Sequence, residues 1–300
     1  MAPLPMDVDT ADDGRPRLAQ ELLDLILDHL HYDPGSLKRC ALTSQALLPT
    51  CQRHLFSTFQ ITKSNVEKLA DLFTHPTSID DHDEYATLRA RVADLLDTYT
   101  TELILTDHPN LVSKSAIKRA RLPEFENLQK ITFKGNELDS DVTIPSFLEQ
   151  AWMSPSSKIR SVEFDFRDMD NRGVLRSLCV LPPTVENVSF TCATAKSGRH
   201  FSAASIREDK WVRILPGRSY QGVHQFNGTM KLRLAPDASH KLLISVMLEL
   251  GELFKFRFER INYRLTHRGD IHQLTSLVYE CKDTLQSLDI MVPSSRTCRA

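Results

Sequence analysis

The chain has 300 residues, of which 41% are hydrophobic and 25% are charged, and its formal net charge is −2. This composition excludes collagen-like, low-complexity and wholly disordered chains, and the length allows one or two domains with a sizeable core. The 37 basic residues are balanced by 39 acidic ones, so there is no overall basic character of the kind that nucleic-acid binding requires. The longest stretch without Asp, Glu, Lys or Arg, Cys40 to Gln52, contains Pro49 and is too short to cross a bilayer as a helix.

The composition of the N-terminal segment indicates neither a targeting signal nor an ordered structure. Residues 1–16 are rich in proline and aspartate and lack both a basic start and an apolar segment. We therefore expect a disordered leader, no secretory signal and no mitochondrial presequence, which favours a cytoplasmic or nuclear protein, or one found in both compartments. The cysteines at 40, 51, 179, 192, 281 and 298 form no CxxC pair. In a reducing compartment we expect them to be free thiols.

Motifs that carry chemistry are missing from the sequence. It contains no GxGxxG, Walker A, GxSxG or HExxH motif, and no histidine pairs with a cysteine at zinc-site spacing. Such motifs create phosphate cradles, nucleophilic elbows and metal sites. We therefore predict a protein that is not an enzyme, with no cofactor and no metal. A catalytic site dispersed along the chain stays an open alternative, because such sites are defined by geometry.

Helical periodicity begins at Leu18. Leu18, Leu22, Ile26 and Leu30 form one apolar stripe, beside a second stripe of Leu23 and Leu27 and a third side with Leu25. We expect a helix over 18–30, a stop at 33–35, a second helix over 37–43 capped by Ser36, and a third helical stretch over 46–56. Pro49 either lies in the first turn of that stretch or breaks it. Three short helices cannot bury this much apolar surface alone, so the rest of the chain or a partner must cover it.

The order of these features resembles an F-box. The chain has Leu18-Ala19-Gln20-Glu21, the pattern LLxxILxxL from Leu22 to Leu30, then Asp33, the segment 36–44, Leu48-Pro49 and the run 53–56. Ala19 and Leu47 stand where the family usually has proline and often has tryptophan. The resemblance is greatest to fungal F-box-like proteins and covers about residues 18–61. It implies a small three-helix domain over 17–61 that binds the Skp-type adaptor of a cullin–RING ubiquitin ligase. By match to the motif, the adaptor would contact Leu18, Glu21, Leu22, Ile26, Leu30, Leu37, Cys40, Leu42 and Thr43.

The rest of the chain repeats a strand-like phrase, apolar-x-x-apolar-x-apolar. Its middle residues are 103, 131, 162, 188, 232, 256 and 288, and most gaps lie near the length of a leucine-rich repeat. Helical patterns at 144–153, 242–250 and 274–285 lie between copies. We therefore predict an α/β fold: the small three-helix F-box followed by an irregular leucine-rich-repeat-like α/β solenoid over 99–300. A non-repeating α/β domain is the alternative. Residues 62–98 would form a helical and acidic linker region, most exposed at 74–85.

The wide gap before residue 232 contains a predicted insertion, 195–228. Aromatic residues are interspersed there with arginines and lysines. Long insertions in repeat arrays often recognise partners, although a plain surface excursion with one buried tryptophan fits the sequence slightly better.

These observations lead to one functional hypothesis and one alternative. The chain would be the substrate-recognition adaptor of a Skp–cullin–F-box ubiquitin ligase, with the helices on the Skp-type adaptor and a protein substrate on the repeats. We expect no nucleic-acid or membrane partner. The alternative is a non-catalytic leucine-rich-repeat-like scaffold, in which the N-terminal helices only cap the solenoid.

Overall fold

A computed structural model describes residues 18–62, 64–66, 68–69, 84–106, 125–138, 157–170, 178, 181–182, 184–196, 224–233, 240–249, 254–265 and 270–292. The chain divides into two compact units, Met1–Leu55 and Phe56–Ala300, which we call the helical unit and the sheet unit. This division falls before the limit of residue 61 that we expected from the sequence. The predicted leader, the helix over 144–153, most of the acidic stretch 74–85 and most of the insertion 195–228 lie outside the described residues.

The helical unit contains α1 (Gln20–His29), α2 (Pro34–Thr43) and α3 (Leu48–Phe56), whose last residue belongs to the sheet unit. All three lie where the sequence predicted helices, and Pro49 occupies the first turn of α3. Leu27, Leu37 and Cys51 are fully buried and form a small core, against which Leu30 and Leu55 pack. Each helix thus contributes one central apolar side chain to this core.

The start of α2 differs from our expectation. Ser36 was expected to cap a helix over 37–43, but α2 begins at Pro34 and its N-cap is Asp33, whose carboxylate accepts a hydrogen bond of 3.1 Å from the Ser36 N–H. Proline fits the first helical position because its missing N–H would be unpaired there anyway. The Asp-Pro-Gly-Ser run is therefore a helix start and not a stop.

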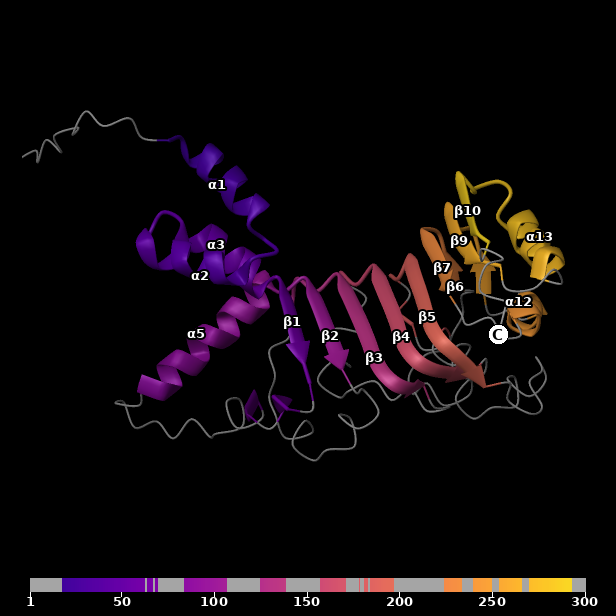
Figure 1. Ribbon diagram of the computed structural model, residues 1–300, viewed down its shortest axis with the longest axis horizontal. Helices are drawn as coiled ribbons and strands as arrows, with labels where there is room; N and C mark the ends of the chain where they lie inside the picture. Colours follow the sequence, from indigo (N-terminus) through magenta and orange to yellow (C-terminus); the bar gives the residue numbers. More distant parts are fainter. Residues whose placement is uncertain are drawn as a thin grey trace, which may run out of the picture. The chain divides into compact units, whose positions relative to one another are not determined.

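The sheet unit is built on one parallel sheet of eight strands (Figure 1). Its strands follow each other across the sheet in the order of the sequence, without a reversal of direction. They are β1 (Thr58–Ile61), β2 (Glu102–Thr106), β3 (Lys130–Leu138), β4 (Ser161–Asp170), β5 (Asn187–Lys196), β7 (Thr229–Arg233), β9 (Arg260–Arg264) and β10 (Ser287–Met291). A mixed α/β fold with a parallel sheet is thereby confirmed.

A second parallel sheet has two strands, β6 (His224–Phe226) and β8 (Phe254–Phe256). Each leads through a short bend into the next strand of the large sheet, β6 into β7 and β8 into β9. Phe226 pairs in register with Phe256, and their rings stack at 5.9 Å. The two segments β6–β7 and β8–β9 are therefore bent in the same way.

Five copies of the strand phrase coincide with the register of the large sheet. Leu103, Ile131, Val162 and Val188 are consecutive partners across β2 to β5, and Leu288 holds the same position in β10. The copies centred on 232 and 256 are wrong in register.

The position of Val188 is taken in β7 by Met230 and in β9 by Ile261. Leu232 lies two residues further along β7, and Phe256 belongs to β8 in the small sheet. In addition, β1 lies in a segment that we assigned to the helical domain.

A regular hydrogen-bond ladder joins consecutive strands at their starts. The carbonyl of the residue before one strand accepts from two successive N–H groups at the next strand, as Thr101 O does from Gln129 and Lys130 at 2.8 and 2.9 Å. The same double acceptance recurs at Ser57, Gln129, Arg160, Gly228 and Glu259. The ladder fixes where each strand begins, since backbone groups in the interior must find partners.

The core of the sheet unit lies on one face of the large sheet. Phe133, Phe164 and Phe190 are register partners whose rings stack at 5.3 and 4.9 Å. The described helices of this unit are α5 (Glu84–Tyr99), α12 (His240–Glu249) and α13 (Asp270–Glu280). The patterns over 242–250 and 274–285 thus correspond to α12 and α13, but α13 begins and ends earlier than expected. Among the described residues, no helix combines the length and hydropathy that crossing a membrane requires.

Candidate functional site

Helix α1 turns polar side chains toward its own unit. Gln20 Nε2 donates to Ala46 O at 3.4 Å, and Asp24 Oδ1 accepts from Thr50 Oγ1 at 2.7 Å. One turn further on, Asp28 Oδ1 lies 2.8 Å from His54 Nε2 and 3.2 Å from Arg53 Nη2. These three α1 residues are spaced at i, i+4 and i+8, so a polar seam runs along the contact of α1 with α3 and the turn before it.

The opposite side of α1 is apolar and faces solvent. Leu18, just before the helix, is 58% exposed, and Leu22, Leu25 and Ile26 are 50–55% exposed. Their spacing of i, i+4, i+7 and i+8 places them on one face. We call these four residues the leucine face. An amphipathic helix of a monomeric domain normally packs its apolar face on the core, so the leucine face is oriented as for a contact outside the unit.

The nine residues predicted to contact an adaptor fall into two groups. Leu18, Glu21, Leu22, Ile26, Leu42 and Thr43 are exposed, with Leu42 at 88%. Leu30 and Cys40 are half-buried and pack against the small core, and Leu37 is 1% exposed within it. A direct contact is therefore open to the first six, whereas Leu37 holds the helices that present them.

Leu25 is a residue of this surface that the sequence analysis left out. The apolar stripe of Leu18, Leu22 and Ile26 placed Leu25 on a separate side of the helix. Its spacing of i+7 from Leu18 and i+3 from Leu22 is the signal that could have included it.

Electrostatics support the polar seam. The Thr50 hydroxyl, and after it the Gln20 amide, hold the pKa of Asp24 below its usual value because both donate hydrogen bonds to the carboxylate. At neutral pH, Asp24 is therefore firmly ionised. Burial raises the pKa of the Cys51 thiol in the core of the same unit. A raised pKa keeps the thiol protonated and unreactive.

The outer face of the large sheet carries charged side chains from its first strands. Lys130 Nζ lies 2.8 Å from Glu102 Oε1 and 3.2 Å from Glu163 Oε2. These two ion pairs link the neighbouring strands β2, β3 and β4. Partial burial works against the charge, but both glutamates outweigh it and raise the pKa of Lys130. Lys134 and Asp165 form a longer pair at 3.7 Å. These strands therefore satisfy their charges within the sheet.

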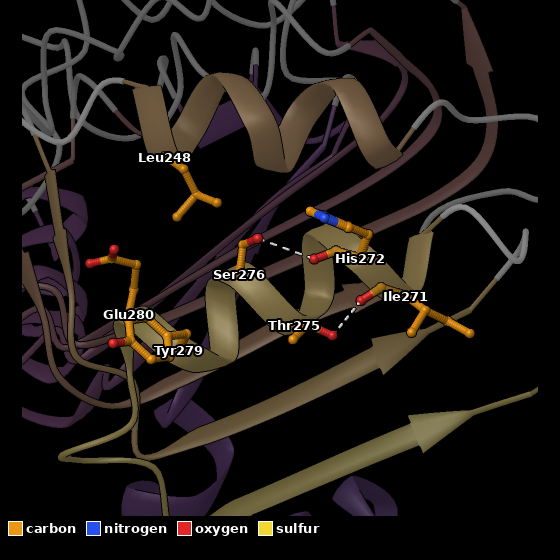
Figure 2. Close-up of a pocket in the computed structure, with 7 residues that line it drawn as sticks. All are labelled: Leu248, Ile271, His272, Thr275, Ser276, Tyr279 and Glu280. Carbon is orange, nitrogen blue, oxygen red and sulfur yellow. Dashed lines mark hydrogen bonds between the residues drawn. The ribbon is translucent and has the colours of Figure 1, made fainter.

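A shallow open groove of about 810 Å³ runs between α12 and α13 (Figure 2). Leu248 extends from α12 toward α13, whose contributing residues are Ile271, His272, Thr275, Ser276, Tyr279 and Glu280. The hydroxyls of Thr275 and Ser276 donate to carbonyls of their own helix at 2.8 and 3.1 Å. Each hydroxyl proton is thus directed to a backbone carbonyl and not to a side-chain base.

Within the part of the chain that the structure describes, no group of three or more His, Cys, Asp or Glu side chains could hold a metal ion. Comparison with known proteins adds no relative: no protein-family model, no curated protein and no solved structure matches the chain. The leucine face is the feature that most needs an explanation.

Proposed function

We propose that the chain is a non-catalytic, F-box-like substrate adaptor of a Skp–cullin–F-box ubiquitin ligase, acting in the cytoplasm, the nucleus or both. The observation that carries the proposal is the second, exposed apolar side of α1, beside the one that buries Leu27. The polar residues of α1 bond to their own unit, while the leucine face is half exposed or more. Apolar residues at i, i+4, i+7 and i+8 suit docking of a helix in an apolar groove, and exposed contiguous apolar surface commonly marks such a site.

Leu42 extends the same argument to α2. It is the most exposed large hydrophobic residue in the part of the chain that the structure describes, and it lies one residue before Thr43, which is also exposed. A leucine with 88% exposure contributes little to its own fold. On a Skp-type adaptor it would bury most of its side chain, which is worth about 1.5–3 kcal/mol for a fully buried leucine.

The sheet unit would hold the substrate, as an irregular leucine-rich-repeat-like solenoid. Each repeat adds one strand to the large sheet, beside the strand of the repeat before it. The hydrogen-bond ladder recurs at nearly every junction between consecutive strands. Such stacking of one supersecondary unit on the next is the principle of solenoid proteins. The mechanism is positional: a substrate held on the repeats has a raised effective concentration near the ligase that the helices recruit.

The test is co-purification of the full chain with a Skp-type adaptor. We expect a one-to-one complex that the double variant Leu22→Asp with Ile26→Asp abolishes, because two charges would have to be buried in an apolar contact. The variant should keep its fold, since both side chains are half exposed in the free protein.

A matched control comes from the sheet unit. Leu88 and Ile271 lie on α5 and α13 and are 54% and 52% exposed, so Leu88→Asp with Ile271→Asp makes the same chemical change at similar exposure. This control should bind the adaptor as the parent chain does. Failure of the parent chain to bind, or equal binding by the leucine-face variant, would refute the assignment. If residues 56–300, which keep β1 in the sheet unit, then aggregate when made alone, the helices are a cap of a scaffold instead.

A further inference from the structure

Two neighbouring strands of the large sheet carry only positive charge on their outer face. In β7 the exposed side chains are Lys231 and Arg233, and in β9 they are Arg260 and Arg264. Buried residues alternate with them, so all four point to the face away from the core. We call these four residues the basic cluster.

The basic cluster is not neutralised within the described part of the chain. No carboxylate there lies within 4.0 Å of any of its four charged groups. The acidic side chain nearest in register is Asp289 of β10, which pairs with Asn262 between Arg260 and Arg264 along the strand. The first strands of the same sheet differ, since Lys130 and Lys134 are matched there by three carboxylates.

Like charges face each other in this cluster. Leu232 is the register partner of Tyr263, so Arg233 and Arg264, the next residues along, stand on adjacent strands about 4.8 Å apart. Like charges at directly opposite positions destabilise a sheet. An anionic ligand would remove this repulsion and gain charge-assisted hydrogen bonds from the guanidinium groups.

The spacing of the four cationic side chains indicates which kind of anionic ligand would fit them. Arg260, Lys231 and the pair Arg233 and Arg264 lie at successive alternate register positions along the strands, about 6.6 Å apart. Alternate side chains of an extended peptide have the same spacing. The neighbouring outward groups Asn262 and Thr229 are neutral hydrogen-bonding residues that could contact the backbone of such a peptide.

We propose that the basic cluster binds an extended segment of a partner protein that carries acidic side chains, glutamate, aspartate or phosphoserine, at alternate positions. This inference rests on the proposed function in one respect, because it names the chemical class of the substrate segment. The binding event itself is independent of the ligase, so it can be tested without the Skp-type adaptor.

The experiment is fluorescence anisotropy with the full chain and a labelled peptide in which glutamate and serine alternate. A phosphoserine version of the peptide distinguishes the two sources of negative charge. We expect binding that weakens as salt rises from about 50 to about 500 mM, since screening shortens the range of the attraction. Arg260→Gln with Arg264→Gln should weaken binding at least about tenfold, the loss expected for one to two charge-assisted hydrogen bonds.

The control variant is Lys130→Gln with Lys134→Gln, which removes two cations from the same face at ion-paired sites. It should bind the peptide as the parent chain does, and both double variants should retain the parent circular dichroism spectrum. The proposal is overturned if neither acidic peptide binds, if the two double variants lose binding equally, or if an oligothymidylate of equal charge binds more tightly than the peptides. Loss of adaptor binding with retained peptide binding would refute only the proposed function.

Discussion

Asn187 and Gly228 approach each other so closely that residue 228 has no room for a side chain. A Cβ atom on Gly228 would lie 2.5 Å from Asn187 Oδ1 and 2.9 Å from Glu186 O. The Asn187 carboxamide is held there because its Oδ1 accepts from the Thr229 N–H at 2.7 Å. At this junction the Glu186 carbonyl accepts from the Gly228 N–H alone. The Asn187 side chain accepts from the next N–H, that of Thr229, in place of the backbone carbonyl that does so at the other junctions.

We expect Gly228→Ala to lower the free energy of unfolding of the sheet unit by about 2 kcal/mol, as for other overpacking changes. Urea denaturation followed by circular dichroism measures the loss. In the background Asn187→Ala the same glycine change should cost less, because one of the two clashing groups is gone. A coupling energy below about 0.5 kcal/mol in this double-mutant cycle would contradict the close approach.

Thr184 makes a second kind of bond between repeats. Its Oγ1 donates to Ile159 O in the preceding repeat at 2.8 Å. Thr184→Val keeps the shape and removes the donor, so we expect a loss of about 1 kcal/mol in the free energy of unfolding. Thr275→Val is the control: that exposed hydroxyl donates to Ile271 O at 2.8 Å within its own helix, and its removal should change stability by less than about 0.5 kcal/mol. Equal effects of the two changes would argue against a bond between repeats.

The sequence predicted strands well where two apolar residues stand alone at alternate positions. Val188 with Phe190 and Ile131 with Phe133 are such pairs, and both lie in strands of the large sheet. The prediction failed at residues 254–264, where Phe254, Phe256 and Phe258 form a stronger alternation than Ile261 and Tyr263. Both segments contain a strand, but which one joins the large sheet depends on distant backbone bonds, such as Glu259 N–H to Gly228 O at 2.9 Å.

The spacing of the leucines likewise did not predict the orientation of α1. Periodicity places Leu22 and Ile26 on one face and Leu27 on another, but either face could have been the buried one. The choice depends on Asp24 and Asp28 finding Thr50 and His54, which lie 26 residues away in the chain. Hydrogen bonds over such a separation leave no local signal. The same holds for the basic cluster, because Arg233 and Arg264 come to lie side by side only through the register of β7 and β9.

The bond between Asp24 and Thr50 makes the helical unit sensitive to acid. Because the folded-state pKa of Asp24 is lowered, the stability that this carboxylate contributes is present above its usual value of 3.8 and is lost as pH falls through the lowered pKa. Thr50→Val should raise the pKa of Asp24 toward 3.8, which an NMR titration of the side-chain carboxyl carbon measures. Thr43→Val removes a hydroxyl bonded to Cys40 O and should leave Asp24 unchanged. An unaltered Asp24 titration in Thr50→Val would show that the hydroxyl is not its main partner.

Cysteines allow the stability of each unit to be read separately. Cys51 and Cys281 are both fully buried, one in the helical unit and one in the sheet unit, and burial raises the pKa of each thiol. Cys40 is partly exposed. At neutral pH we expect iodoacetamide to label Cys40 readily and the two buried thiols only after unfolding, as peptide mass spectrometry would measure.

In increasing urea, Cys51 should become reactive before Cys281. Among the described residues, the core of the helical unit has three fully buried apolar side chains, whereas that of the sheet unit extends from Ile61 of β1 to Cys281 after α13. A core as small as that of the helical unit gives marginal stability. A bound Skp-type adaptor would shift the Cys51 transition to higher urea and leave the Cys281 transition in place, because a ligand stabilises only the state that it binds. Simultaneous labelling of both thiols at one urea concentration would contradict two separately unfolding units.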